Sequence, residues 1–139
     1  MGKVVLESKN DCVAMMFGLT QLTPSDLYSQ CAIALSKENI SFYNDNCYDM
    51  TGENGNHIHK IRINIPLSEL VSIVRTTFIR NKKFKNHRKL SFVVNSQEMT
   101  IDVFYFKKDD KIVNGFLKML KRIKKIKITE CELDFHEDY

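Results

Sequence analysis

The sequence predicts a mainly β domain with one C-terminal α-helix, in which a barrel or strongly bent antiparallel sheets are capped by that helix. Short apolar runs separated by tight polar turns fill the middle of the chain, and a helical period appears within residues 111–125. The 139 residues are 43% hydrophobic and 27% charged, with five Gly and two Pro. This composition is typical of one folded domain and excludes disordered or fibrous classes.

The first predicted hairpin lies near the middle of the chain. Residues 31–35 and 40–43 are apolar runs joined by four polar residues, which is a common hairpin connection length. Residues 44–56 contain two Gly with several Asn and Asp, so we expect a loop there. In residues 61–65 apolar and polar residues alternate, which predicts a half-buried strand. Pro66 ends its ladder because proline has no N–H to donate.

Further strands are predicted before the helix. Leu70–Ile79 is rich in β-branched residues, and residues 90–94 and Met99–Phe106 flank a four-residue polar turn of hairpin length. Near the start of the chain, residues 4–6 and 13–17 are apolar enough to be strands.

The helix predicted within residues 111–125 is amphipathic. Its apolar residues cover about half of the helical circumference, and lysines and an arginine occupy the other side. Asp109 and Asp110 precede it where a capping acceptor and negative charge are favourable. We expect the apolar stripe to pack against a face or an open end of the sheet. A second, short helix is suggested through Leu27 and Tyr28, capped by residues 23–26.

Charge divides the chain into three blocks within its net charge of +4. Residues 1–74 carry a net −3, residues 75–129 a net +12 and residues 130–139 a net −5. We therefore assign a single domain to residues 1–129 and an acidic tail to residues 130–139. The tail alternates with period two, so it either adds to a sheet edge, or folds over the basic surface, or frays as chain ends commonly do.

Two segments resemble a known family. Residues 32–43, AIALSKENISFY, are similar to the strand, tight turn and aromatic-bearing strand of bacterial pleckstrin-homology-like (PH-like) and GRAM-like domains. Residues 63–70, INIPLSEL, resemble the step between two later strands, and the resemblance covers about residues 30–125. It implies a PH-like barrel and a binding module. The chain has no Trp in the closing helix and few basic residues within 4–17, where phosphoinositide-binding members place them, so inositol-lipid binding is not predicted.

The candidate binding site is a basic segment over residues 80–89, which we expect to be a projecting loop or widened hairpin. Such a cluster attracts anions, and an aromatic ring there can stack on a base or insert among lipid headgroups. We hypothesise that it engages a protein partner or an anionic membrane surface, or, with less support, nucleic acid. The competing interpretation is a charged, solvated hairpin. The site comprises Arg80, Lys82, Lys83, Phe84, Lys85, Arg88 and Lys89.

Other functions find little support in the sequence. No catalytic or nucleotide-binding motif is present, so we expect no enzyme activity and no cofactor. His57, His59 and Cys47 lack standard zinc-ligand spacing, so no metal is expected. Cys12, Cys31 and Cys131 are predicted to be reduced core thiols. With no membrane-spanning run and no signal peptide, we expect a cytoplasmic protein, or one peripheral at the inner membrane surface. The sequence leaves the oligomeric state open.

Overall fold

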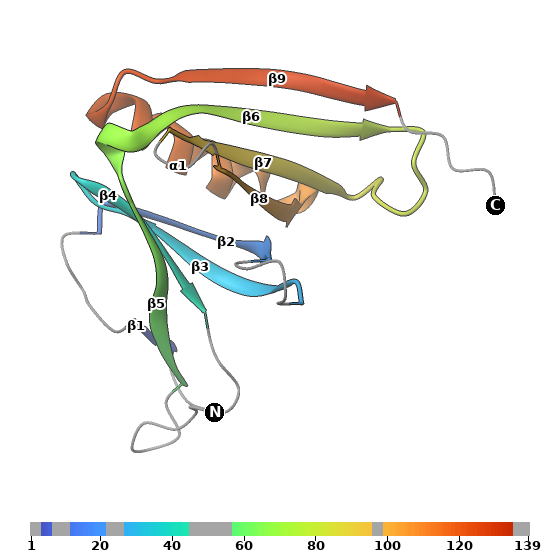
Figure 1. Ribbon diagram of the computed structural model, residues 1–139. Helices are drawn as coiled ribbons and strands as arrows, with labels where there is room; N and C mark the ends of the chain where they lie inside the picture. Colours follow the sequence, from blue (N-terminus) through green and yellow to red (C-terminus); the bar gives the residue numbers. More distant parts are fainter. Residues whose placement is uncertain (1–3, 7–11, 22–26, 45–56, 96–98, 135–139) are drawn as a thin grey trace.

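The computed structural model describes residues 4–6, 12–21, 27–44, 57–95 and 99–134, which form one mixed sheet and one α-helix (Figure 1). Within these residues the sheet has nine strands in the order β1-β5-β4-β3-β2-β8-β7-β6-β9. The elements are β1 (Val4–Leu6), β2 (Ala14–Thr20), β3 (Ser29–Leu35), β4 (Asn39–Asn44), β5 (His57–Pro66), β6 (Leu70–Ile79), β7 (His87–Val94), β8 (Met99–Phe106), α1 (Asp110–Ile123) and β9 (Lys127–Asp134), with 3-10 turns η2 (Leu67–Glu69) and η3 (Lys107–Asp109).

The sheet consists of two antiparallel halves that diverge in Figure 1 and meet where β2 pairs with β8. One half runs from β2 to β5 and the other from β6 to β8. The predicted class, mainly β with a C-terminal helix and a strongly bent sheet, is confirmed. The barrel is wrong, because β1 and β9 lie at separate edges of an open sheet. Both edge strands pair in parallel, so the sheet is mixed rather than wholly antiparallel.

Most predicted elements are confirmed, including the hairpin β3–β4 and the strands β1, β6 and β8. Pro66 ends β5, and the 3-10 turn that follows is tied back by the Leu67 amide, which donates to the Glu38 carbonyl at 2.8 Å. The suggested short helix is not seen at Leu27 and Tyr28, which belong to no helix or strand, while residues 22–26 lie outside the described residues. The predicted loop over residues 44–56 also falls largely outside them.

The helix α1 begins one residue earlier than predicted. Asp109 occupies the N-cap position, but its side chain makes no capping hydrogen bond. The carboxylate of Asp110 instead accepts a hydrogen bond of 3.1 Å from the Tyr105 hydroxyl on β8. At the other end, the Lys124 ammonium donates to the carbonyl oxygens of Leu67 and Leu70, which fixes the helix end to the bend between β5 and β6.

Part of the predicted acidic tail is strand. Residues 130–134 belong to β9, which runs parallel to β6 with Ser72 opposite Lys127 and Ile79 opposite Asp134. The interpretation in which this segment adds to a sheet edge therefore holds for these residues. Residues 135–139 lie outside the described part of the chain.

Among the described residues, the larger of two clusters of buried apolar side chains lies between the helix and one face of the bent sheet. It includes residues from both halves of the sheet, and the apolar stripe of α1 packs among them. In β8 the alternation is clear, since Ile101, Val103 and Tyr105 are buried while Asp102 and Phe104 are only partly covered. We call the face that carries α1 the inner face and the opposite one the outer face. The fully buried large side chains include Phe42, Phe92, Phe116, Met16, Ile33, Leu35, Ile40 and Leu120.

Gly18 permits the close approach of the two sheet halves. A Cβ atom at this position would overlap Cγ1 of Val103 and would lie 3.0 Å from the carbonyl oxygen of Phe104. A side chain at position 18 would therefore force β2 and β8 apart. Gly115, on the exposed side of α1, has open space at the same position.

We expect Gly18→Ala to lower the free energy of unfolding by about 1–3 kcal/mol, because the added methyl group overpacks the junction. Gly115→Ala is the matched control and should raise it by about 0.5–1 kcal/mol, since alanine favours the helix over glycine. Urea unfolding followed by circular dichroism measures both values. Equal effects of the two substitutions would show that β2 and β8 do not approach as described.

The cysteine prediction is only partly correct. Cys31 is buried in β3, and burial raises the pKa of its thiol to about 11. Cys12 and Cys131 are exposed, and their assignment to the core is wrong. Cys12 precedes β2, and Cys131 lies on the outer face of an edge strand, so an apolar neighbourhood in the sequence did not imply burial.

In a Cys47→Ser background, which removes the one thiol outside the described residues, we expect two thiols to react rapidly with DTNB in the native protein. Cys31 should react only after unfolding, because the reactive thiolate is scarce when the pKa is raised and the side chain is covered. The stoichiometry of released thionitrobenzoate before and after adding guanidinium reports this. Rapid reaction of all three thiols would contradict the burial of Cys31.

Candidate functional site

The basic segment folds as a compact turn between β6 and β7. Arg80 adopts a left-handed backbone conformation with φ of 58°, which reverses the chain after β6. The next side chain, Asn81, is buried, and its Oδ1 accepts hydrogen bonds from the amides of Lys83 at 2.9 Å and Phe84 at 3.1 Å. Asparagine side chains often close turns in this way. We call residues 80–86 the basic turn.

Three lysines of the basic turn point into solvent, whereas its aromatic residue does not. Lys82, Lys83 and Lys85 are exposed, and Phe84 is half-buried. The Phe84 ring packs against Phe78 of β6 with 5.2 Å between ring centroids. The lysines therefore project from a turn that is held to the sheet by its own aromatic side chain.

The remaining predicted site residues separate from these lysines. Arg80 forms an ion pair with Asp134 at the end of β9. Arg88 and Lys89 lie on opposite faces of β7 because successive strand residues alternate. Arg88 faces inward, where its Nη1 donates to Thr77 at 2.7 Å and its Nε lies 3.0 Å from the Asp110 carboxylate. Lys89 is half-buried opposite Phe104 of β8.

An aromatic cluster lies beside the basic turn on the outer face. Phe104 stands between Phe84 and Tyr28, with ring centroids 5.8 Å and 5.7 Å away. His87 contacts Phe84 on one side and Phe106 on the other, at 6.2 Å and 4.8 Å. We call these rings, together with Phe78, the aromatic cluster.

Several residues of this surface were missed in the sequence. The Lys107 amide donates to the carbonyl of Asn86 at 2.8 Å, which places η3 beside the basic turn. Lys107 and Lys108 are both exposed, and the Lys108 ammonium lies 5.4 Å from the Phe106 ring centroid. A signal was present, because the alternation that buries Tyr105 puts Phe104 and Phe106 on the side normally left to polar residues.

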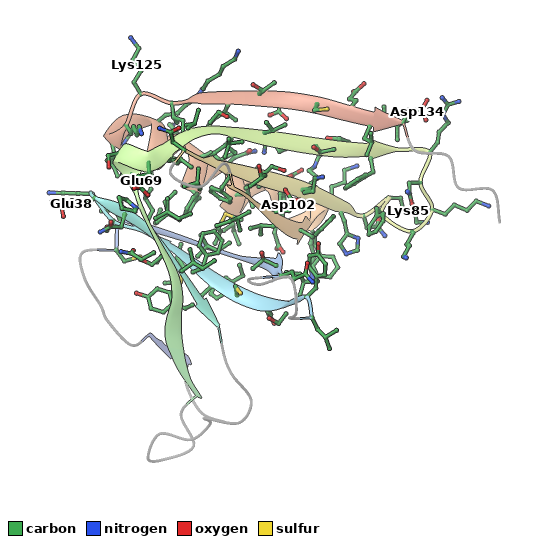
Figure 2. The ribbon with its side chains drawn as sticks, viewed as in Figure 1. Glu38, Glu69, Lys85, Asp102, Lys125 and Asp134 are labelled. Atoms are coloured by element: carbon green, nitrogen blue, oxygen red, sulfur yellow. The ribbon has the colours of Figure 1, made fainter. Side chains whose placement is uncertain are left out.

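The lysines in the C-terminal half of α1 and just after it, Lys118, Lys121 and Lys125, belong to a different region of the surface. Figure 2 shows Lys125 and Lys85 at opposite ends of the molecule. Because α1 begins next to η3 and rises about 1.5 Å per residue, the C-terminal end of its 14 residues lies about 20 Å from its start. The basic middle of the sequence is thus divided between two separate surfaces.

A polar network on the inner face holds the helix and β9 to β6. The Arg75 guanidinium donates to Glu130 of β9 at 2.7 and 2.9 Å and to Oδ1 of Asn114 of α1 at 2.5 Å. The hydrogen bond from Arg75 to Glu130 raises the pKa of Arg75, so the guanidinium stays charged. Burial raises the pKa of Tyr105 to about 12, which keeps its hydroxyl protonated as a donor to Asp110. These contacts are structural, since they connect three elements around the core.

Neither a metal-binding group of side chains nor a membrane-spanning helix is found among the described residues. Cys47 and the side chains of His57 and His59 lie outside what the structure describes. Among the described side chains, no group of three His, Cys, Asp or Glu is placed to hold a metal ion. In the same part of the chain, no helix has the length and apolar content needed to cross a bilayer.

The hydrogen bonds that Asn81 accepts in the basic turn can be tested by mutation. We expect Asn81→Ala to lower the free energy of unfolding by about 1 kcal/mol, because two backbone amides lose their acceptor. The loss is moderated because the buried Nδ2 of Asn81 has no partner within the described residues. Asn86→Ala, an exposed position in the same turn, should change stability by less than about 0.5 kcal/mol. Urea denaturation, with amide exchange at Lys83 and Phe84, separates the two; equal protection in both variants would contradict the proposed turn.

No protein-family model matches the chain, and no curated protein is significantly similar to it in sequence. Among solved structures, the fold is similar to the hSac2 domain from human phosphoinositide phosphatase Sac2, with a TM-score of 0.53 and 15% sequence identity. The similarity covers 90% of this chain and 86% of that chain. At this identity the similarity concerns the fold alone.

The predicted membership in the PH-like and GRAM-like families is therefore wrong. The segments behind it, residues 32–43 and 63–70, form a hairpin and a strand-to-strand step that any bent antiparallel sheet can contain. These short sequence patterns do not specify the order of the strands in the sheet. The chain is similar in fold to the hSac2 domain, and its own described residues form an open mixed sheet with one α-helix.

Proposed function

We propose that this chain is a non-enzymatic binding module that engages an anionic membrane surface through the basic turn. The observation that carries the proposal is the joint exposure of Lys82, Lys83 and Lys85 on a turn anchored by Asn81 and Phe84. A fixed turn presents the three ammonium groups together, so they can approach lipid phosphates at the same time.

The expected strength is modest. Each basic residue near an anionic bilayer contributes about 1 kcal/mol, within a Debye length of about 8–10 Å. The three turn lysines would together contribute about 3 kcal/mol, and Lys107 and Lys108 lie close enough to add to the same potential. The binding should therefore be reversible and strongly dependent on salt.

The cytoplasmic location follows only as part of this proposal, because anionic lipids are enriched on the cytoplasmic leaflet. A protein partner with an acidic surface is the outcome to consider if vesicles are not bound. Nucleic acid is less favoured, since Phe84 of the basic turn is half-buried and packs on Phe78 and Phe104 rather than forming a free stacking platform.

The similarity to the hSac2 domain suggests which lipid to compare with phosphatidylserine. That domain comes from a phosphoinositide phosphatase. Binding to vesicles that contain phosphoinositide can be compared with binding to vesicles in which phosphatidylserine supplies the same total charge. Equal binding at equal charge supports a general electrostatic interaction, which is what the proposal states.

We expect Lys82→Gln/Lys83→Gln/Lys85→Gln to weaken binding to phosphatidylserine-containing vesicles about 100-fold, which corresponds to about 3 kcal/mol. Co-sedimentation at low and at physiological salt measures the partition coefficient. Binding should require phosphatidylserine and should fall as salt rises.

The matched control is Lys118→Gln/Lys121→Gln/Lys125→Gln, which removes the same charge from exposed positions on and after α1. It should lose far less affinity, because Lys125 lies at the other end of the molecule from Lys85 (Figure 2), and Lys118 and Lys121 lie two or more helical turns along α1 from η3. Equal losses in both triple variants would mean that net charge, rather than the basic turn, drives binding. No sedimentation of the unmodified protein at low salt would remove the membrane proposal altogether.

A further inference from the structure

The outer face of the sheet next to the basic turn exposes apolar side chains in aligned rows. The strand register puts Leu133 of β9 beside Phe78 of β6, and His87 of β7 opposite Phe106 of β8. In the neighbouring row Phe104 is opposite both Lys89 and Leu19 of β2. An outer face would normally be polar, so the presence of Leu133, Phe78, Phe106, Phe104 and Leu19 beside His87 and Lys89 makes this part of the face unusually apolar.

Within this surface some rings support the others. Phe78, Phe84 and Phe104 are half-buried and packed together, with Phe78 and Phe104 stacked at a centroid distance of 6.3 Å. Beside these rings, Tyr28 contacts Phe104 and Phe106 contacts His87, and they are 52% and 46% exposed; Leu27, which precedes Tyr28 in the chain, is 87% exposed. Tyr28 is held in place by its edge-to-face contact with Phe104. We call Leu27, Tyr28 and Phe106 the apolar tip.

The charges around the apolar tip indicate what it contacts. Lys83 stands 5.6 Å from the Phe84 ring centroid and Lys108 stands 5.4 Å from the Phe106 ring centroid, so ammonium groups border the aromatic cluster. Apolar side chains bordered by lysines match an anionic bilayer, whose phosphates lie just outside its acyl chains. Tyrosine also favours this boundary, because its ring is apolar and its hydroxyl can remain hydrated.

We propose that the apolar tip enters the boundary between headgroups and acyl chains while the lysines of the basic turn contact the phosphates. This inference rests on the proposed membrane function and adds its geometry: the outer face where β6 and β8 end and β7 begins is turned toward the lipid. The helix α1, on the inner face, stays on the side away from the bilayer. Insertion adds an apolar contribution that salt does not screen.

The absence of Trp from the sequence allows a clean test. In Phe106→Trp and Tyr28→Trp the single indole should show a blue-shifted emission when anionic vesicles are added, and strong quenching by lipids brominated on the acyl chains. The matched control is Ile112→Trp, at a position 53% exposed on α1, which should show neither change. Co-sedimentation of the same samples reports how much protein is bound.

These readings separate the two proposals. If the variants do not sediment with vesicles at low salt, the membrane function itself fails. If they sediment while the indoles of Tyr28→Trp and Phe106→Trp are no more quenched than that of Ile112→Trp, the function stands and the insertion is overturned. A blue shift without vesicles, accompanied by a dimer in sedimentation velocity, would assign the apolar tip to self-association and would also overturn the insertion.

A second variant measures the apolar contribution without altering the aromatic cluster. Leu27→Ser changes a side chain that is almost wholly exposed, so folding should be unaffected. We expect it to weaken binding to phosphatidylserine vesicles about 10-fold at physiological salt, because a leucine side chain no longer leaves water. Val71→Ser, at an exposed position on β6, is the control and should leave binding unchanged. An unchanged affinity for Leu27→Ser would contradict the insertion of Leu27.

Discussion

The junction between β2 and β8 is the constraint on which the rest of this structure depends. Each half of the sheet is a local meander, and the pairing of Leu19 with Phe104 and Thr20 with Val103 joins them. Only a residue without a side chain fits at Gly18, because a Cβ atom there would overlap Val103 of β8. Once joined, the halves share one core with α1. The same junction brings Tyr28, which immediately precedes β3, onto the ring of Phe104, so the outer surface is a consequence of core assembly.

Strand alternation then distributes function over the two faces. In β8 the residues that fill the core are Ile101, Val103 and Tyr105, which leaves Phe104 and Phe106 to the outer face. In β7 the same rule sends Arg88 to an inner ion pair and Lys89 to the outer face. The side chains of a contiguous basic run in the sequence are therefore divided between those that stabilise the fold and those that face solvent. The inner charges are matched by Asp110 and Glu130, whereas the lysines of the basic turn face solvent.

Elements that are held by contacts between neighbouring residues could be predicted from the sequence, whereas contacts between distant residues could not. The hairpin β3–β4, the ends of β6 and β8 and the helix α1 are set by neighbouring residues, and their periodicity or turns predicted them. Addition of the tail to a sheet edge was only one of three alternatives, and neither β6 as its partner nor the parallel direction was predicted, because nothing in residues 130–134 specifies them. Tyr28 was missed for the same reason, since its contact with Phe104 spans most of the chain. Cys131 was misassigned because alternation indicates a strand but not whether that strand is central or at an edge.

The surface that results suits reversible binding better than permanent anchoring. Three turn lysines provide about 3 kcal/mol at an anionic bilayer, and a charge patch alone loses strength as salt screens it. Stable attachment to membranes generally needs two signals of different kind. Here the fold places both on one side, because the turn that carries the lysines is anchored by Phe84, and Phe84 packs against the base of the apolar tip. Neither contribution could be moved without disturbing the other, so the position of the lysines and the exposure of the apolar tip are one structural feature.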